Sequence, residues 1–191
     1  MDTIAVIGGT GQLGTAIARR LAKAGRDVTL GSRDERRARS AAADLARNCG
    51  RELRGTTNMA AAAAADIVIL AVPFAVHAAT LKEIRGALAG KLLIDATVPL
   101  VAPKVMRVQL PPEGSAAVAA QRLLGSDTTV AAAFHNVPAH KLVTDEAIDC
   151  DVLVFGDERA TRDRVIGIVE ACGLRGLHAG PLVNSTAAEA L

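Results

Sequence analysis

The chain has few aromatic residues and few cysteines. It contains no Trp, no Tyr and three Phe among 191 residues, although half of its residues are hydrophobic. A buried core must therefore be built from Ala, Val, Leu and Ile. Cys49, Cys150 and Cys172 lie far apart and form no CxxC pair, which argues against a disulfide framework and fits a reducing compartment. We expect all three to be buried or inert thiols.

Long apolar runs and a strong net charge are also lacking. A membrane-spanning helix needs about 18 or more apolar residues, and the most apolar stretch, 60–72, is interrupted by Asp66. The 22 basic and 20 acidic side chains leave a net charge of +2, which is too small to indicate nucleic-acid binding by itself. The N-terminal residues lead into an apolar segment without a basic leader. The sequence thus predicts a cytoplasmic protein with no membrane or nucleic-acid partner.

A glycine-rich segment near the N-terminus is the most informative part of the sequence. The apolar run 4–7 precedes Gly9-x-Gly11-x-x-Gly14, and apolar residues at helical spacing follow over 15–22. This pattern is typical of a buried strand that turns directly into a helix. In a dinucleotide-binding turn the glycines permit a tight turn, close approach of the backbone to a pyrophosphate, and close helix packing. The free N–H groups of the first helical turn then face the phosphates.

Strand-like and helix-like segments alternate through the first half of the chain. The expected strands are 3–8, 27–31, 52–57, 66–72 and 92–95, and the expected helices are 12–24, 34–47, 59–65 and 75–88. The run 66–72 is continuously apolar and bounded by Pro73, which is typical of a fully buried parallel strand. The alternation predicts an α/β fold with a Rossmann-like, doubly wound, mainly parallel sheet and a small C-terminal extension.

The second half of the chain is less regular. Four prolines break 98–114 into a long connection, and such connections are usually functional loops. The segments expected after it are a helix from Ser115 to Leu124, strands over 128–134 and 151–155, a helix over 160–172 and a last edge strand over 174–178. No repeat or linker divides the chain. We therefore predict a single domain over 1–191, with a dinucleotide-binding half, 1–97, and a substrate-contacting half, 98–191.

The end of the second strand indicates which dinucleotide is bound. NAD sites usually carry Asp or Glu at this place, about 20 residues beyond the glycines, but here Gly31-Ser32-Arg33 occupies it. A hydroxyl and a guanidinium suit a 2′-phosphate, and Arg37 lies one helical turn further as a second cation. The sequence therefore favours NADP over NAD.

Other charged residues near this point leave alternatives open. Asp34 and Glu35 could, in another geometry, serve the ribose instead. Arg36 and Arg39 could simply form a solvated basic face of the helix.

Five segments of the chain, in order, resemble the NADPH-dependent F420 reductases, also called F420H2:NADP oxidoreductases. The segments are 8–14, 31–33, 71–74 with His77, 134–139 and 179–185. Many reductases share the glycine motif, but its combination with the last two segments is far more specific. The resemblance implies reversible hydride transfer between C4 of the nicotinamide and C5 of an 8-hydroxy-5-deazaflavin, without a metal. It implies NADP(H) as cofactor, coenzyme F420 as co-substrate, and a homodimer.

The resemblance also assigns roles to residues. Those that would contact the pyrophosphate are Thr10, Gly11, Gln12 and Leu13, and those for the 2′-phosphate are Ser32, Arg33 and Arg37. Those beside the nicotinamide would be Val72 and Pro73, and those around the deazaflavin ring would be His135, Val137, Pro138 and Ala139, with Val98 and Pro99. A hydride exchanger has only to hold its two rings in a near-attack arrangement, so no residue is assigned as an acid or base.

The histidines and Ser185 indicate no competing chemistry. His135 and His140 lie five residues apart without the Glu of a zinc helix, so no metal site is predicted. His135 could donate a hydrogen bond to the deazaflavin carbonyl region or only line the pocket. His77 and His178 are expected to be surface or packing residues. Ser185 lies outside any GxSxG motif and is expected in a turn or helix cap.

Two other functions remain open at this point. The chain could be an NADPH-dependent reductase of a flavin, a ferric centre or an imine, although an imine reductase would need a helical substrate domain for which the chain is too short. It could also be a non-enzymatic NADPH-binding sensor, which would lack a second pocket. The proline-rich connection and 135–139 argue against the sensor.

Overall fold

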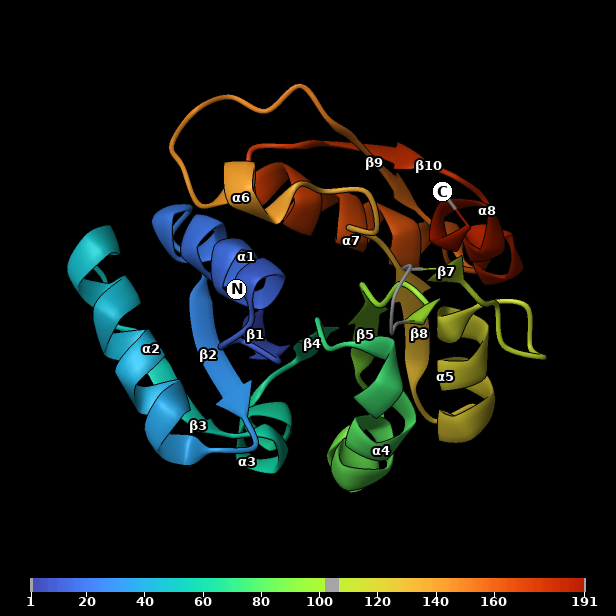
Figure 1. Cartoon of the computed structure of the whole chain (residues 1–191), viewed down its shortest axis with the longest axis horizontal. Helices are drawn as coiled ribbons and strands as arrows, with labels where there is room; N and C mark the ends of the chain where they lie inside the picture. The colour runs from blue at the N-terminus through green and yellow to red at the C-terminus, as the bar shows by residue number, and fades with distance from the viewer. Residues whose placement is uncertain (1, 102–106, 191) are drawn as a thin grey trace.

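A six-stranded parallel sheet forms the centre of the computed structural model, which describes residues 2–101 and 107–190. Its strand order is β3-β2-β1-β4-β5-β8 (Figure 1). The strands are β1 (Thr3–Ile7), β2 (Asp27–Ser32), β3 (Arg54–Thr57), β4 (Ile67–Leu70), β5 (Leu92–Asp95) and β8 (Thr129–Ala132). The predicted doubly wound α/β fold is confirmed, and the expected strands differ from these by a few residues at their ends.

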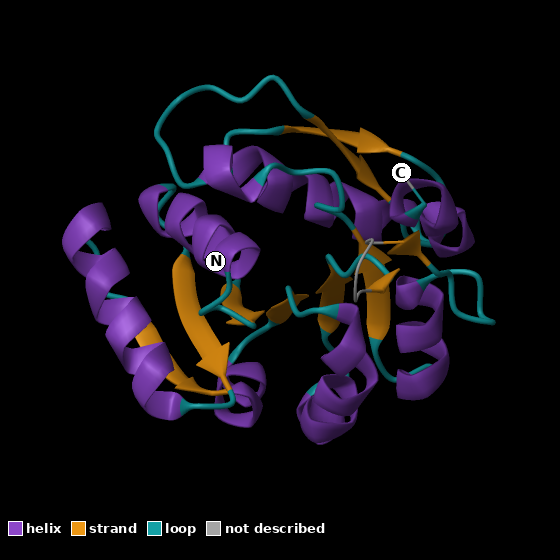
Figure 2. Cartoon of the chain, in the orientation of Figure 1, coloured by secondary structure: helices purple, strands orange, loops and turns teal. Residues whose placement is uncertain are grey.

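Helices cover both faces of this sheet (Figure 2). One face carries α1 (Gln12–Lys23), α2 (Glu35–Cys49), α6 (Ala139–Leu142) and α7 (Arg159–Ala171). The other carries α3 (Asn58–Ala64), α4 (Phe74–Ile84) with the 3₁₀ turn η1 (Arg85–Ala87), α5 (Ala116–Leu124), and α8 (Ser185–Glu189) after the 3₁₀ turn η2 (Leu182–Asn184). Along β1, Ile4 and Val6 join the first core while Ala5 and Ile7 join the second, because successive side chains of a strand point to opposite faces. A strand buried on both faces reads as a continuous apolar run.

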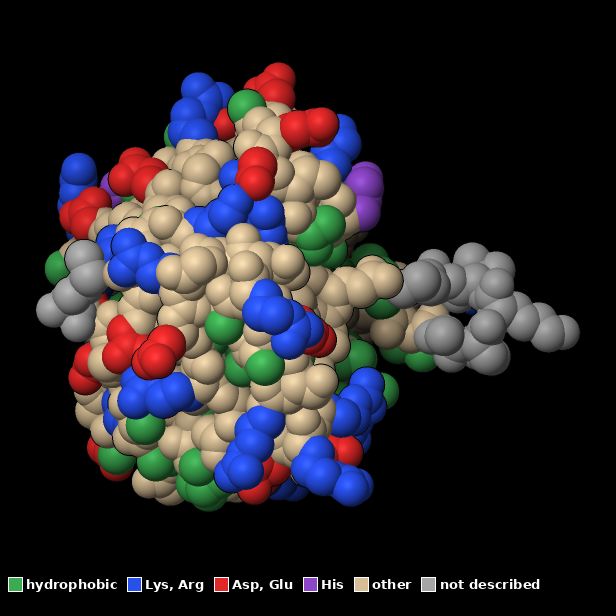
Figure 3. Space-filling model, turned by 90° about the vertical axis from the view of Figure 1, so that its left-hand side faces the viewer, with side chains coloured by type: hydrophobic (Ala, Val, Ile, Leu, Met, Phe, Trp, Pro, Cys, Tyr) green, Lys and Arg blue, Asp and Glu red, His purple; other side chains and the backbone are tan. Residues whose placement is uncertain are grey.

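Charged residues at the start of α2 form hydrogen bonds and an ion pair within the helix itself. The Asp34 carboxylate caps this helix by accepting the N–H groups of Arg36 (2.9 Å) and Arg37 (3.3 Å), and this type of cap stabilises a helix start. On the exposed side, Arg39 pairs with Glu35 at 2.7 Å. Figure 3 shows acidic and basic side chains interspersed over the face seen there. The solvated-face alternative therefore holds for Arg39, whereas Asp34 caps the helix and also lines the cavity described below.

The second half departs from prediction in three places. The connection 98–114 contains β6 (Leu100–Val101) and β7 (Arg107–Val108), which pair antiparallel, while 102–106 fall outside the described residues. The strands β9 (Asp151–Val154) and β10 (Arg175–His178) form a separate parallel pair, joined to the main sheet by an Ala132–Phe155 bridge. The expected last strand is therefore an edge of this small sheet. Helices α6 and α8 were not expected, because four or five residues are too few to show a helical period.

The thiols differ in burial. Cys172 is fully buried, and burial raises its pKa to about 12, so this thiol matches the expectation of an inert group. Cys49 and Cys150 are half-buried and free. No helix within 2–101 or 107–190 is long and apolar enough to cross a membrane.

Candidate functional site

The turn between β1 and α1 lies at the carboxyl edge of the sheet, where the strand order reverses between β1 and β4. Ligands of doubly wound sheets bind at this point. Gly8 has a φ of +79°, and a Cβ on it would lie 2.4 Å from the Ala71 carbonyl oxygen. A Cβ on Gly14 would lie 2.5 Å from the Gly8 carbonyl oxygen. The third glycine of the motif thus packs closely, as predicted, and the left-handed conformation belongs to Gly8, directly before the motif.

The N-terminus of α1 is left open toward this turn. Gly11 is its N-cap, and among the described residues no side chain caps it and no acid stands in its first turn. A Cβ on Gly11 would meet only the Gly8 carbonyl oxygen, at 3.3 Å. Because the first N–H groups of a helix lack partners within it and carry positive partial charge, this end can accept an anion.

A cavity of about 510 Å³ opens beside the turn. Its lining residues are Gly8, Thr10, Gly11, Ser32, Arg33, Asp34, Arg37, Asn58, Ala71, Val72, Pro73, Val76 and Thr80. Seven residues predicted for the dinucleotide are thus brought together. Gly9, Gln12, Leu13 and Gly14 do not line it: Gln12 is exposed at the start of α1 and Leu13 packs against the core.

Two cations reach the cavity from the segment after β2. Arg33 and Arg37 line it beside Ser32, whose hydroxyl accepts the N–H of Asp34 at 3.3 Å. Within 2–101 and 107–190, neither guanidinium forms an ion pair, in contrast to Arg39. Guanidinium groups bind phosphate through paired, charge-assisted hydrogen bonds. The open helix end and the two cations therefore fit an NADP molecule in this cavity.

Sequence reasoning missed several lining residues, of which Asn58 is the most polar. Asn58 follows β3 and begins α3, and it is 2% exposed. Thr80 and Val76 come from α4, and Gly8 and Ala71 from the ends of β1 and β4. The signal available was positional, because polar residues directly after parallel strands gather at one edge of the sheet.

His135 lies apart from this cavity. Its side chain is 1% exposed, and its Nε2 lies 4.0 Å from Glu189 Oε1 without a hydrogen-bond partner among the described residues. Burial lowers its pKa to about 4, so the imidazole is neutral at physiological pH. Its ring packs edge-on against Phe155. The preceding residue, Phe134, is fully buried with a φ of +70°, which is uncommon outside glycine and asparagine.

The other residues predicted for the deazaflavin are not among the described residues that line the cavity at the dinucleotide turn. Val137 is buried, and Pro138 and Ala139 are half-buried at the start of α6. Val98 and Pro99 lie between β5 and β6. Their assignment remains a prediction carried by the resemblance.

His77 is a packing residue and not a surface one. Its Nε2 lies 2.6 Å from Asp95 Oδ2, and both side chains are buried. Burial alone would lower the pKa of His77, but the hydrogen bond and charge of Asp95, with the charge of Glu189, raise it. Asp95 also accepts the N–H of Thr97 at 3.0 Å. His178 is partly exposed and lies 3.1 Å from Asp163.

Ser185 begins α8 and does not cap it. Its hydroxyl donates to the Ser115 hydroxyl at 2.8 Å, and Ser115 caps α5 as predicted. The Glu189 carboxylate accepts the N–H groups of Ala116 and Ala117. The short C-terminal helix is thus tied to the start of α5.

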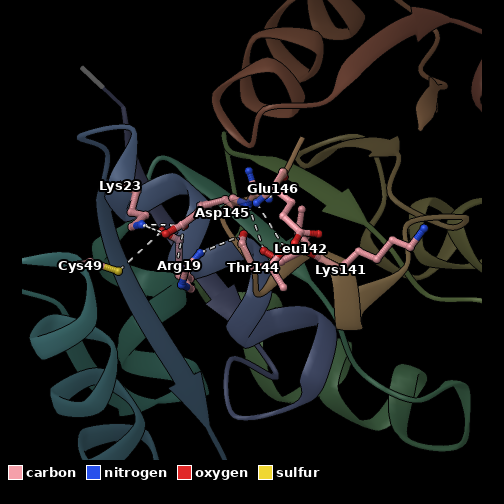
Figure 4. Close-up of polar contacts among 9 residues, drawn as sticks. Arg19, Lys23, Cys49, Lys141, Leu142, Thr144, Asp145 and Glu146 are labelled. Carbon is pink, nitrogen blue, oxygen red and sulfur yellow. Dashed lines mark hydrogen bonds and ion pairs between the residues drawn. The ribbon is translucent and has the colours of Figure 1, made fainter. Parts of the chain in front are cut away.

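The helix that begins at the dinucleotide turn also holds the segment after α6 (Figure 4). The guanidinium groups of Arg19 and Arg20 donate to three backbone carbonyl oxygens, one on the last residue of α6 and two in the segment after it. The acceptors are Thr144 for Arg19 (3.2 Å), and Leu142 (3.0 Å) and Glu146 (2.8 Å) for Arg20. Asp145 lies between Arg19 at 2.7 Å and Lys23 at 2.6 Å. The two halves of the chain are therefore joined through α1.

Comparison with known proteins identifies the family. The family model described as NADP oxidoreductase coenzyme F420-dependent matches residues 3–99. An F420-dependent NADP reductase from Methanothermobacter thermautotrophicus is 42% identical over 191 residues, covering 95% of this chain and 82% of that protein. The chain belongs to this family.

Further relatives agree with this family assignment. The F420-dependent NADP reductase of Methanocaldococcus jannaschii is 34% identical, covering 98% of this chain and 88% of that protein. The crystal structure of a putative F420-dependent NADP-reductase from an Arthrobacter species superposes with a TM-score of 0.84 at 26% identity, covering 99% of this chain and 89% of that one. An imine reductase from Streptomyces aurantiacus, with a TM-score of 0.69 at 22% identity over 98% of this chain and 59% of its own, shares the fold.

Proposed function

We propose that this member of the family transfers a hydride between NADPH and the deazaflavin coenzyme F420. The observation that carries the proposal is the cavity at the switch point, where an open helix N-terminus lies beside Val72 and two arginines, Arg33 and Arg37, that form no ion pair with any described residue. Relatives named F420-dependent NADP reductase, 34–42% identical over nearly the whole chain, support the second coenzyme. Reduction of a flavin, ferric or imine acceptor is not favoured, since the imine reductase resembles the chain in fold alone.

Different residues of the cavity would bind different parts of the dinucleotide. The N–H groups at the start of α1, beside Thr10 and Gly11, would hold the pyrophosphate, while Ser32, Arg33 and Arg37 would hold the 2′-phosphate. Val72 and Pro73, which follow the end of β4, would face the nicotinamide. The bound coenzymes supply the hydride chemistry between C4 and C5, and the chain contributes position and the exclusion of water.

The residues that would contact the deazaflavin are His135, Val137, Pro138 and Ala139, with Val98 and Pro99. This part of the proposal is supported by the resemblance and by the hydrogen bonds through which α1 holds the adjoining segment. A homodimer in the cytoplasm completes the proposal, supported by the resemblance and by the reducing compartment that free thiols suit.

The activity can be tested by mixing the purified protein with NADPH and oxidised F420 and following the loss of the deazaflavin absorption band. A parallel cuvette contains FMN in place of F420. Loss of the F420 band without FMN reduction is expected. NADPH oxidation with FMN alone would refute the assignment of the acceptor.

The dinucleotide assignment has its own test in Arg33→Ala. This variant should bind NADPH about 1.5–3 kcal/mol more weakly, because it loses charge-assisted hydrogen bonds to the 2′-phosphate, and should bind NADH almost unchanged. Isothermal titration calorimetry with both nucleotides measures the difference. Arg39→Ala is the matched control, since Arg39 is already paired with Glu35. Equal losses for NADPH and NADH would contradict the 2′-phosphate role.

A further inference from the structure

The side chain of Asn58 contains a buried oxygen that no other group of the chain satisfies. Asn58 is 2% exposed and lines the same cavity as Ser32 and Arg33. Throughout the described part of the chain, its Oδ1 finds no hydrogen-bond donor. Buried polar atoms in folded proteins are almost always paired, because an unpaired acceptor keeps its full desolvation cost. The oxygen therefore points to a donor that the chain itself does not supply.

The orientation of this amide follows from its surroundings. Its Nδ2 lies 3.5 Å from Glu83 Oε2, and exchanging the two ends would set the amide oxygen against that carboxylate. The oxygen lies instead over Gly31, 3.2 Å from the place that a Cβ on this glycine would occupy. The last torsion of an asparagine side chain has a broad minimum. Rotation about this torsion would turn Oδ1 toward the cavity that Asn58 lines.

The sheet register places Asn58 where the ribose specificity of such sites is decided. β2 and β3 pair Ser32 with Thr57, so Asn58 stands beside the loop that carries Arg33. NAD enzymes use an Asp or Glu at the end of the second strand to accept a hydrogen bond from the ribose. A carboxylate would repel a 2′-phosphate here. Asn58 offers an acceptor without a charge.

We propose that Asn58 accepts a hydrogen bond from the 3′-hydroxyl of the adenosine ribose of NADP(H). In NADP the 2′-oxygen is phosphorylated, so the 3′-hydroxyl is the donor that this ribose retains. The proposal rests on the dinucleotide part of the proposed function and is independent of the second coenzyme. Asn58 then gives affinity for both dinucleotides, whereas Arg33 distinguishes between them.

Direct binding tests this role without catalysis. Titration calorimetry with NADPH and NADH compares the unaltered protein with Asn58→Leu, Asn58→Asp and the control Met59→Ala, which changes the neighbouring exposed residue. Asn58→Leu should weaken both nucleotides about tenfold, the effect of one neutral hydrogen bond, and keep their ratio. The isosteric Asn58→Asp keeps an acceptor but adds charge, so NADPH should weaken at least tenfold more than NADH. Met59→Ala should change neither.

A ligand lacking the hydroxyl identifies the donor. Adenosine 2′,5′-bisphosphate and its 3′-deoxy form are titrated into the unaltered protein and into Asn58→Leu, which gives a double-substitution cycle. The unaltered protein should lose about tenfold in affinity without the 3′-hydroxyl, and Asn58→Leu should lose none. Equal losses in both proteins, or unchanged binding in Asn58→Leu, would overturn the role of Asn58 alone. Absence of NADPH binding by the unaltered protein would overturn the proposed function as well.

Discussion

The carboxyl group of Glu189 should make the stability of the fold depend on pH. This side chain is 0% exposed and lies between α8 and the first turn of α5, where its oxygens accept the N–H groups of Ala116 (2.5 Å) and Ala117 (3.2 Å). Burial raises its pKa from 4.5 to about 7, although these two hydrogen bonds act in the opposite direction. The folded protein therefore favours the neutral carboxylic acid.

The sign of the effect follows from proton linkage. A group with a raised pKa in the folded state contributes stability that is fully present below its unfolded pKa, 4.5, and is lost as the pH rises through about 7. Since one pKa unit corresponds to about 1.4 kcal/mol, the loss is at most about 3 kcal/mol. Glu189→Gln replaces the carboxyl group with a neutral amide of the same shape. Because the amide NH2 cannot accept one of the two backbone N–H groups, the variant carries a constant loss of stability. We therefore expect the unfolding free energy of the variant, relative to that of the unaltered protein, to rise by up to about 3 kcal/mol between pH 4.5 and pH 8.

Urea unfolding at several pH values between 4.5 and 8 measures this difference. Contributions from titrating groups that do not interact with Glu189 cancel because both proteins share them; His77 is an exception, since the charge of Glu189 helps to raise its pKa. Glu170→Gln is the matched control, since Glu170 is exposed on α7, and its difference from the unaltered protein should not vary with pH. A Glu189→Gln difference that is constant over this range would refute the buried, neutral state of the carboxyl group.

Two further substitutions test the turn and the α1 contacts. Gly14→Ala should weaken NADPH binding at least tenfold in calorimetry, because its Cβ would press to 2.5 Å from the Gly8 carbonyl oxygen and open the turn; Gly86→Ala, which meets nothing within 4 Å, should not. Arg20→Ala should speed hydrogen exchange in the segment after α6, because it removes the hydrogen bonds to the carbonyl oxygens of Leu142, which ends α6, and of Glu146 within the segment. Unchanged exchange there would show that these bonds do not hold the segment.

The dinucleotide half was predictable because its signals are local. The spacing of the glycines, the continuous apolar strands and the Ser32-Arg33 pair after β2 each express one structural constraint within a few neighbouring residues. Seven of the predicted residues consequently meet in one cavity. The positive φ of Gly8, which precedes the motif, was not part of the prediction.

Structural features that depend on contacts between residues far apart in the sequence could not be predicted from local sequence patterns. Asn58 reaches the cavity only because β3 pairs with β2 in a particular register, and His77 is buried because Asp95 lies opposite it. The separate β9–β10 sheet depends on how the chain returns after β8. Such outcomes are set by tertiary contacts, which local periodicity does not encode.

The central place of β1 also decides how the protein can be handled. All strands of the main sheet are parallel, and the carboxyl end of β1 points to the cavity, so Thr3 emerges at the opposite edge. At the other end of the chain, Ser185 and Glu189 are buried. A purification tag, a biosensor linker or a fused partner enzyme is therefore best attached before β1. There it lies far from the nucleotide entrance and does not disturb the packing of α8 against α5.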